Sequence, residues 1–345
     1  MAVLALPPRV ELARRPTPLQ YLARASERWG QGHRLWVKRD DLSGCLLSGN
    51  KVRKLEFIVA HALAEGYDTL ITCGGLQSNH CRATAFAGAQ SGLAVHLLLR
   101  GEEPAVGEGN YLLDQLAGAR INCYPKHRYV NELADLFAHW QDYYAGLGRK
   151  ALAIPTGGSD GLGAWGYIAA CEELATDLAA AAIDSAHLVT ATGSGGTQAG
   201  LTLGASLYDL PLTVWGVNVC DDEQYFLDKV ASDSADWQAR FPCAPAVSLQ
   251  PRVLDGHVGA GYGLAGPEVF ELIAELAALE GLLLDPVYTG KAFHGMLAEL
   301  AAGRFRDCRD IIFLHTGGVF GVFPQAQQFT FASARGAGLN TGQES

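Results

Sequence analysis

A repeating pattern constrains the fold of this chain more than any other feature: a short apolar run, a glycine-bearing turn, then an amphipathic stretch. Strands that alternate with helices favour parallel sheets with helices on both faces, because each parallel connection must cross over the sheet. About nine strands are expected, at 35–37, 69–73, 94–99, 120–123, 151–154, 187–192, 212–217, 282–284 and 311–314. Helical spacing predicts helices at 51–65 and 78–90. It also predicts a helix that follows the turn at 157–159 and ends near residue 180, and a helix that begins at residue 197.

So many strands in 345 residues predict an α/β protein with two doubly wound open-sheet domains and a cleft between them. We expect a large domain from residues 1–53 plus 164–330 and a small one from residues 54–163. Residues 331–345, small and polar, are expected to form a flexible tail. Periodicity alone also allows two sequential domains. Ligands of such folds bind beyond the carboxyl ends of the strands, which is where this chain keeps its glycine clusters.

Charge and composition exclude several classes of partner. The net charge of −10 argues against nucleic acid or an anionic membrane, although backbone amides can still bind a small anion. No run approaches the roughly 18 apolar residues of a membrane span, and no secretion signal is recognisable. The eight cysteines lack metal-ligand spacing and are expected to be reduced thiols. These features predict a cytoplasmic protein without a metal.

The segment Ser48-Gly49-Asn50-Lys51 is a candidate nucleophile site. Lys51 opens a predicted helix, and the positive end of the helix dipole disfavours its ammonium form. An amine placed this way is suited to a Schiff base with a carbonyl cofactor. Lys54, one turn further on, is interpreted as a solvated or phosphate-facing charge. A surface position for Lys51 is an equally good interpretation of this segment by itself.

The segment 192–197, with the sequence Thr-Gly-Ser-Gly-Gly-Thr, is a candidate phosphate cradle between a strand and a helix. It is not a Walker A loop, because no Lys-Ser/Thr pair closes it, so it does not favour a magnesium-nucleotide site. Nor does a suitably placed acid complete a dinucleotide fingerprint. The alternative is a tight turn that requires glycine for steric reasons only.

The segment Gln77–His80 also lies at a predicted strand end and helix start. Ser78, Asn79 and the free amides near them could bind a carboxylate, and Ser78 could act as a nucleophile or carry a proton. The alternative is that Ser78 or Asn79 is only a helix N-cap. His80 is interpreted as a supporting group, because no acid completes a triad-like arrangement.

Hydroxyl groups are expected at the same sheet edge from the segments 284–291 and 314–318. Tyr288 and Thr289 could contact a ligand, and Tyr262 could reach it from a glycine-flanked loop. Each is weak support by itself, because tyrosines near strand ends usually serve in packing.

Together the segments resemble a known family. Their order is Lys-Arg-Asp-Asp, Ser-Gly-Asn-Lys-x-Arg-Lys-Leu-Glu, Gln-Ser-Asn-His, Pro-x-Gly-Gly-Ser, Thr-Gly-Ser-Gly-Gly-Thr-Gln-Ala-Gly, Asp-Pro-Val-Tyr-Thr-Gly-Lys and His-Thr-Gly-Gly. This order resembles the D-cysteine desulfhydrase/1-aminocyclopropane-1-carboxylate (ACC) deaminase family of fold type II pyridoxal-phosphate (PLP) enzymes, from about residue 14 to residue 325. The resemblance implies a tryptophan synthase β-like fold with PLP in the cleft, a small amino-acid substrate and a homodimer.

The resemblance also implies residue roles. Lys51 would bond covalently to PLP, Asn79 would hydrogen-bond its phenolic oxygen, and residues 193–197 would bind its phosphate. The implied cofactor-binding residues are Lys51, Lys54, Asn79, Gly193, Ser194, Gly195, Gly196, Thr197, Thr289 and Thr316. The implied substrate-binding residues are Ser78, Asn79, His80, Gly158, Tyr262 and Tyr288, and the implied catalytic residues are Lys51, Ser78, Tyr262 and Tyr288.

Two positions distinguish the branches of this family. ACC deaminases carry Glu after the Val-Tyr pair, facing the pyridine nitrogen, and Leu in the last motif, whereas this chain has Thr289 and Thr316. A hydroxyl suffices where a good β-leaving group departs. The expected reaction is therefore elimination from D-cysteine to pyruvate, ammonia and sulfide.

Alternatives to this reaction are ACC deamination to α-ketobutyrate and ammonia, a lyase for another β-substituted amino acid such as cysteate, a non-catalytic binder and a nucleotide-binding protein. Lys51 is the default base for the Cα proton, with Ser78 or Tyr288 as alternatives.

Overall fold

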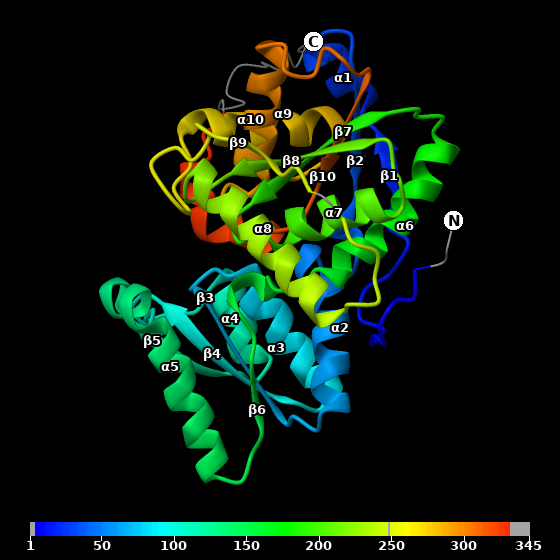
Figure 1. Cartoon of the computed structure of the whole chain (residues 1–345). Coiled ribbons are helices and arrows are strands. Elements are labelled where there is room, and N and C mark those ends of the chain that lie inside the picture. Colours follow the sequence, from blue (N-terminus) through cyan, green and yellow to red (C-terminus); the bar gives the residue numbers. More distant parts are fainter. Residues whose placement is uncertain (1–3, 248, 332–345) are drawn as a thin grey trace, which may run out of the picture.

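The computed structural model describes residues 4–247 and 249–331, and its strands form two separate open sheets (Figure 1). The larger sheet has the order β1-β2-β10-β7-β8-β9 and the smaller one β5-β4-β3-β6. The larger sheet contains β1 (Leu19–Tyr21), β2 (Arg34–Lys38), β7 (Ala186–Thr192), β8 (Leu212–Asn218), β9 (Arg252–Leu254) and β10 (Asp310–Leu314). The smaller sheet contains β3 (Thr69–Gly75), β4 (Ala94–Arg100), β5 (Arg120–Tyr124) and β6 (Ala151–Ala153).

Helices cover both faces of each sheet, which confirms the predicted fold class (Figure 1). On the larger sheet, one face packs against α1 (Ala23–Trp29), α9 (Pro267–Glu280) and α10 (Thr289–Ala301). The other face packs against α6 (Trp165–Ala180) and α7 (Gly196–Leu207), with α8 (Glu223–Arg240) alongside α7. On the smaller sheet, α2 (Asn50–Ala64), α3 (Asn79–Ser91) and α4 (Gly109–Leu116) lie opposite α5 (Lys126–Gly146). Short 3-10 turns complete the chain: η1 (Asp40–Leu42), η2 (Thr156–Gly158), η3 (Val319–Gly321) and η4 (Phe323–Gln328).

The strand β4 shows why the central strands are continuous apolar runs. Leu97 and Leu99 are fully buried against the core under α2 and α3, whereas Leu98, also fully buried, faces α5. A strand covered on both faces needs apolar side chains at successive positions instead of an alternating pattern. The helix α2 then packs against both α3 and α6, so it joins the layers of the two sheets.

The structure corrects the predicted strands in two places. The segment 282–284 is not a strand, because β10 is already paired on both sides by β2 and β7. The carbonyl oxygen of Leu283 instead accepts a hydrogen bond of 2.9 Å from Nε2 of His315. Conversely, β1 and β9 are three-residue edge strands that the pattern did not predict, and β1 pairs antiparallel with β2 in an otherwise parallel sheet.

Strands β1 and β2 precede the smaller sheet along the chain, and β7 to β10 follow it. The expected tail lies outside the described residues except for Phe331. Within residues 4–247 and 249–331, no helix is both long and apolar enough to cross a membrane. All eight cysteines are free thiols.

Candidate active site

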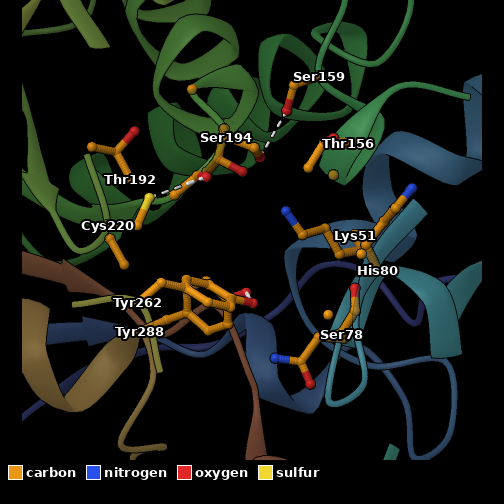
Figure 2. Close-up of a pocket in the computed structure, with 18 of the residues that line it drawn as sticks. Lys51, Ser78, His80, Thr156, Ser159, Thr192, Ser194, Cys220, Tyr262 and Tyr288 are labelled. Atoms are coloured by element: carbon orange, nitrogen blue, oxygen red, sulfur yellow. Dashed lines mark hydrogen bonds between the residues drawn. The ribbon is translucent and has the colours of Figure 1, made fainter. Parts of the chain in front are cut away.

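Strand ends from both sheets and the start of α2 border a cavity of about 410 Å³ (Figure 2). This volume suits a small organic ligand. The predicted site residues that line it are Lys51, Ser78, Asn79, His80, Gly193, Ser194, Gly195, Thr197, Tyr262, Tyr288 and Thr316. Four other predicted site residues are not part of this lining: Lys54, Gly158, Gly196 and Thr289.

Lys51 is the second residue of α2, and a close backbone approach fixes its position. The preceding Gly49 has φ +87°, and a Cβ there would lie 2.4 Å from the carbonyl oxygen of Thr316. The same carbonyl accepts a 3.1 Å hydrogen bond from the amide of Asn50. Only glycine fits such a contact with this backbone conformation, so the turn holds Lys51 against the loop after β10.

The Lys51 amine makes no hydrogen bond or ion pair with any residue that the structure describes. Burial lowers its pKa to about 8, because a desolvated ammonium is disfavoured. About a tenth of such an amine is neutral at pH 7, compared with far less for an ordinary lysine. Figure 2 shows the Lys51 side chain among the drawn pocket residues. It is therefore available as a nucleophile or base.

The glycine segment between β7 and α7 forms a cradle of backbone amides. Gly195 has φ +80°, and the amide of Gly196 donates a 3.2 Å hydrogen bond to Oγ of Ser159. A Cβ on Gly196 would lie 2.6 Å from that oxygen, so the segment also packs tightly against the turn at η2. The side chain of Asn50 donates a 2.9 Å hydrogen bond to Oγ1 of Thr197. The free amides of the first turn of α7 can bind an anion.

Lys54 lies directly beneath this cradle. Its Nζ donates hydrogen bonds to the carbonyl oxygen of Gly157 (3.2 Å) and to Oγ of Ser159 (3.1 Å). The side chain is fully buried, and burial together with the nearby Lys51 charge holds the pKa of Lys54 well below its usual value. No described carboxylate lies within ion-pair distance of its amine. An anionic ligand in the cradle would therefore supply its missing counter-charge.

The serine of the Gln77–His80 segment begins α3. Oγ of Ser78 accepts a 3.2 Å hydrogen bond from the amide of Cys81, so Ser78 is the N-cap of α3. The hydroxyl proton of Ser78 remains free to donate into the cavity. Nδ2 of Asn110 donates a 3.0 Å hydrogen bond to Oδ1 of Asn79, so Asn79 presents its own amide donors.

His80 supports the site without carrying charge. Its Nε2 lies 2.8 Å from Oγ1 of Thr72, and Nδ1 has no partner among the described residues. Burial and the charges of Lys51 and Lys54 hold the pKa of His80 well below its usual value. The imidazole is therefore neutral at physiological pH.

The two tyrosines form a hydroxyl pair on one side of the cavity (Figure 2). The hydroxyl oxygens of Tyr262 and Tyr288 lie 2.5 Å apart. Burial raises the pKa of both groups, so both are protonated near neutral pH. One hydroxyl donates to the other, which leaves one proton of the pair for a ligand. Lys291 fixes the Tyr262 loop by donating 2.7 Å hydrogen bonds to the carbonyl oxygens of Val258 and Gly261.

Thr289 uses its hydroxyl within the protein. Its Oγ1 donates a 2.7 Å hydrogen bond to Oδ1 of Asp285 and accepts one of 2.8 Å from the Asp285 amide. The Asp285 carboxylate also accepts hydrogen bonds from the backbone amides of Val287 and Tyr288. This network shapes the turn from which Tyr288 projects. The predicted contact between Thr289 and a cofactor stays a prediction, whereas Thr316 borders the cavity directly.

Several lining residues were not among the site residues predicted from the sequence: Arg100, Tyr129, Thr156, Ser159, Cys220, Asp221, Tyr225 and Lys229. Ser159 follows the glycine pair at 157–158, and Arg100 and Cys220 follow the predicted strands 94–99 and 212–217. The rule that ligands bind at strand carboxyl ends could have found these three. Lys229, which pairs with Asp233 in the middle of α8, carries no such signal.

Comparisons with known proteins agree with this geometry. A family model described as "Pyridoxal-phosphate dependent enzyme" matches residues 10–317. A putative ACC deaminase of Thermotoga maritima is 40% identical over 93% of this chain and 99% of its own length. The bifunctional, mitochondrial D-cysteine desulfhydrase/ACC deaminase of Arabidopsis thaliana is 38% identical over 92% of this chain and 80% of its own length.

A solved structure shares the fold. The crystal structure of an ACC deaminase homologue superimposes with a TM-score of 0.85 at 36% identity, and the match covers 93% of this chain and 95% of that one. The family model and the identities to both relatives span nearly the whole chain. The chain therefore belongs to the family of pyridoxal-phosphate-dependent enzymes, and pyridoxal 5'-phosphate is its cofactor.

Proposed function

We propose that the chain catalyses α,β-elimination on a small β-substituted amino acid, with D-cysteine as the substrate and pyruvate, ammonia and sulfide as products. The observation that carries this proposal is the partnerless, low-pKa Lys51 amine in a cavity shared with a glycine cradle and a tyrosine pair. The relatives named above include an enzyme whose name carries both D-cysteine desulfhydrase and ACC deaminase.

The residues present fit PLP. The cradle of residues 193–197 and the buried Lys54 cation suit its phosphate, and the Lys51 amine suits its aldehyde. Asn79 has free amide donors for its phenolic oxygen. When bound, PLP supplies an electron sink for the electron pair of the broken Cα–H bond.

The amides of the first turn of α3 are the expected site for the substrate carboxylate, with Ser78 as an added hydrogen-bond donor. We assign removal of the Cα proton to the Lys51 amine. If the proton lies on the opposite face, Ser78 or Tyr288 takes that role. The Tyr262–Tyr288 pair then holds a proton near the departing sulfur. The Cβ–S bond breaks with its electron pair on sulfur, and the released 2-aminoacrylate reacts with water to give pyruvate and ammonia.

Thr289 favours D-cysteine over ACC. A threonine carries no charge, and its hydroxyl proton is already donated to Asp285. This position therefore lacks the carboxylate that the ACC deaminase branch uses to strengthen its electron sink. Loss of sulfide needs a weaker sink than opening a cyclopropane ring, because sulfide is a good leaving group.

A substrate panel tests the proposal. Purified PLP-loaded protein is supplied separately with D-cysteine, L-cysteine, D-serine, ACC and β-chloro-D-alanine, and the keto acid is identified. Pyruvate from D-cysteine and β-chloro-D-alanine, with little α-ketobutyrate from ACC, is the expected result. Release of α-ketobutyrate from ACC as the main activity would overturn the assignment to D-cysteine.

The proposal extends to three further features, of which the resemblance supports the homodimer, whereas the cysteine pattern and the strand pattern support the other two. The enzyme is a homodimer, works in the cytoplasm, and divides into a domain of residues 1–53 and 164–330 and one of residues 54–163. Light scattering of the holoenzyme, cell fractionation and limited proteolysis test these features in turn.

A further inference from the structure

Arg100 borders the cavity at a defined place. It is the last residue of β4 and pairs in register with Gly75 at the end of β3. Its guanidinium carbon lies 5.0 Å from the ring centroid of Tyr262 and 5.8 Å from that of Tyr129. Contacts of this kind hold a planar cation over aromatic faces and restrict its motion.

The charge of Arg100 has no counter-ion in the protein. Within the described residues the guanidinium makes no ion pair and no side-chain hydrogen bond, although the side chain is half-buried. The only carboxylate in the described cavity lining is that of Asp221, which already accepts a 3.0 Å hydrogen bond from Sγ of Cys220. Lys229, another lining cation, is paired with Asp233. Lys51, the third lining cation, is assigned to the cofactor aldehyde, so Arg100 is the lining cation that remains available for an anionic group of the substrate.

The position of Arg100 selects which end of an amino acid it can reach. The substrate carboxylate is expected at the first turn of α3, on the side of Ser78, whereas Arg100 stacks on the Tyr262 side. Figure 2 shows Tyr262 and Tyr288 across the drawn pocket residues from Lys51. A Cβ on Gly75 would lie 3.6 Å from the Tyr262 ring, so glycine here leaves the space between the two sides open. A substrate anchored at α3 then directs its β-substituent towards Tyr262 and Arg100.

We propose that Arg100 is a specificity-determining residue that binds a negatively charged β-substituent, so that the preferred substrates are amino acids with an anionic group on Cβ, such as a thiolate or a carboxylate. This inference rests on the proposed function. In the elimination, the electron pair of the Cβ–S bond leaves with sulfur, which takes a proton from the Tyr262–Tyr288 pair and departs as hydrosulfide, and the Cα proton goes to the base. The guanidinium pairs with the negative charge that the β-substituent already carries in the bound substrate.

A binding experiment with a matched pair of ligands tests the proposal independently of elimination. D-Aspartate and D-asparagine differ in the charge of the β-substituent and hardly in shape, and neither carries a good leaving group; the L enantiomers are measured in parallel. Binding to the holoenzyme is followed by calorimetry and by the absorbance change of the bound cofactor. We expect one enantiomer of aspartate to bind at least about 10-fold more tightly than its amide, as a charge-assisted hydrogen bond implies.

Substitutions locate this preference. Arg100→Gln should abolish the preference for aspartate over asparagine, and Arg100→Lys should keep part of it. Arg252→Gln is the matched control, because Arg252 also stacks on an aromatic ring, at 5.2 Å from the Trp215 centroid, but lies away from the cavity lining. Equal affinity of the wild-type enzyme for the two ligands, or an equal loss of both affinities in Arg100→Gln, would overturn the proposal.

A kinetic experiment adds a readout on the reaction. Arg100→Gln should lower kcat/KM for D-cysteine about 10- to 100-fold, and for the neutral β-chloro-D-alanine less than about 3-fold. A proportional loss on both substrates would indicate a purely structural role and would refute the assignment. If the wild-type enzyme forms no pyruvate yet keeps an Arg100-dependent preference for aspartate, the proposed function fails and the specificity role stands.

Discussion

Replacing Lys54 by methionine tests how this protein holds a phosphate. The change removes the buried cation beneath the glycine cradle and keeps a side chain of similar length. In the wild-type protein, the Lys54 amine has hydrogen bonds to Gly157 and Ser159 but no ion pair with a described residue. The variant should therefore bind PLP more weakly, because the phosphate loses its nearest buried positive charge.

The expected loss follows from the contact that disappears. A hydrogen bond to a charged group contributes about 1.5 to 3 kcal/mol, which corresponds to about a 10- to 150-fold increase in the Kd for PLP. Pyridoxal has the same ring and aldehyde but no phosphate. The affinity for pyridoxal should differ less than about 3-fold between the two proteins, because pyridoxal has no phosphate for the cradle and Lys54 to bind.

The assay is equilibrium titration of cofactor-free protein with PLP and with pyridoxal, followed by the absorbance of the lysine-bound cofactor. Lys126→Met, an exposed lysine on α5, is the control for a lost positive charge, and circular dichroism confirms that each variant is folded. Equal weakening of PLP and pyridoxal, or PLP affinity unchanged within about 2-fold, would refute the phosphate role of Lys54.

Two further predictions concern Lys51. Lys51→Ala should bind PLP without the visible absorbance of a lysine-bound cofactor, and mass spectrometry after borohydride reduction should detect no cofactor adduct. The control Lys150→Ala, which replaces an exposed lysine, should keep both signals. A cofactor adduct that persists in Lys51→Ala at wild-type stoichiometry would contradict the assignment. Because burial lowers the pKa of Lys51 to about 8, its neutral amine fraction rises with pH and levels off above that value. The rate of pyridoxal coupling to cofactor-free protein should follow this curve, and a rate that keeps rising towards the pKa of an ordinary lysine, about 10.4, would show that Lys51 is not the reacting amine.

The sequence predicted the central strands well and the edges of the sheets poorly. Strands such as β3 and β7 are buried on both faces, so they leave an apolar run ended by glycine. The edge strands β1 and β9 pair with one neighbour over three residues and leave no such run. The apolar segment 282–284 was misread because burial alone does not make a strand: a strand also needs a neighbour with free backbone groups.

The site residues could be predicted where all the residues of one binding feature lie in a single short segment of the sequence. Lys51 and the cradle each lie within a single strand-to-helix connection, so local sequence places them. Arg100 depends on long-range pairing, because only the register of β4 against β3 sets it beside Gly75 and so within reach of Tyr262. The surroundings of Lys54 could not be predicted either, because they come from the turn at η2 and from Gly196 of α7, more than a hundred residues away in the sequence.

Local placement explains how a chain with a net charge of −10 can hold an anionic cofactor. Exposed charges are screened within about 8 Å at physiological salt, so the acidic surface contributes little inside the cavity. Lys51, Lys54 and Arg100 are buried or half-buried and have no counter-ion within ion-pair distance among the described residues, so the solvent screens their fields far less. Desolvating three cations in one region is unfavourable in the free protein, as the lowered pKa values of Lys51 and Lys54 indicate. That cost is recovered when an anion binds, because each contact then replaces missing hydration. The cavity is thus complementary to two negatively charged groups at its two ends, the phosphate of the cofactor and the β-substituent of the substrate.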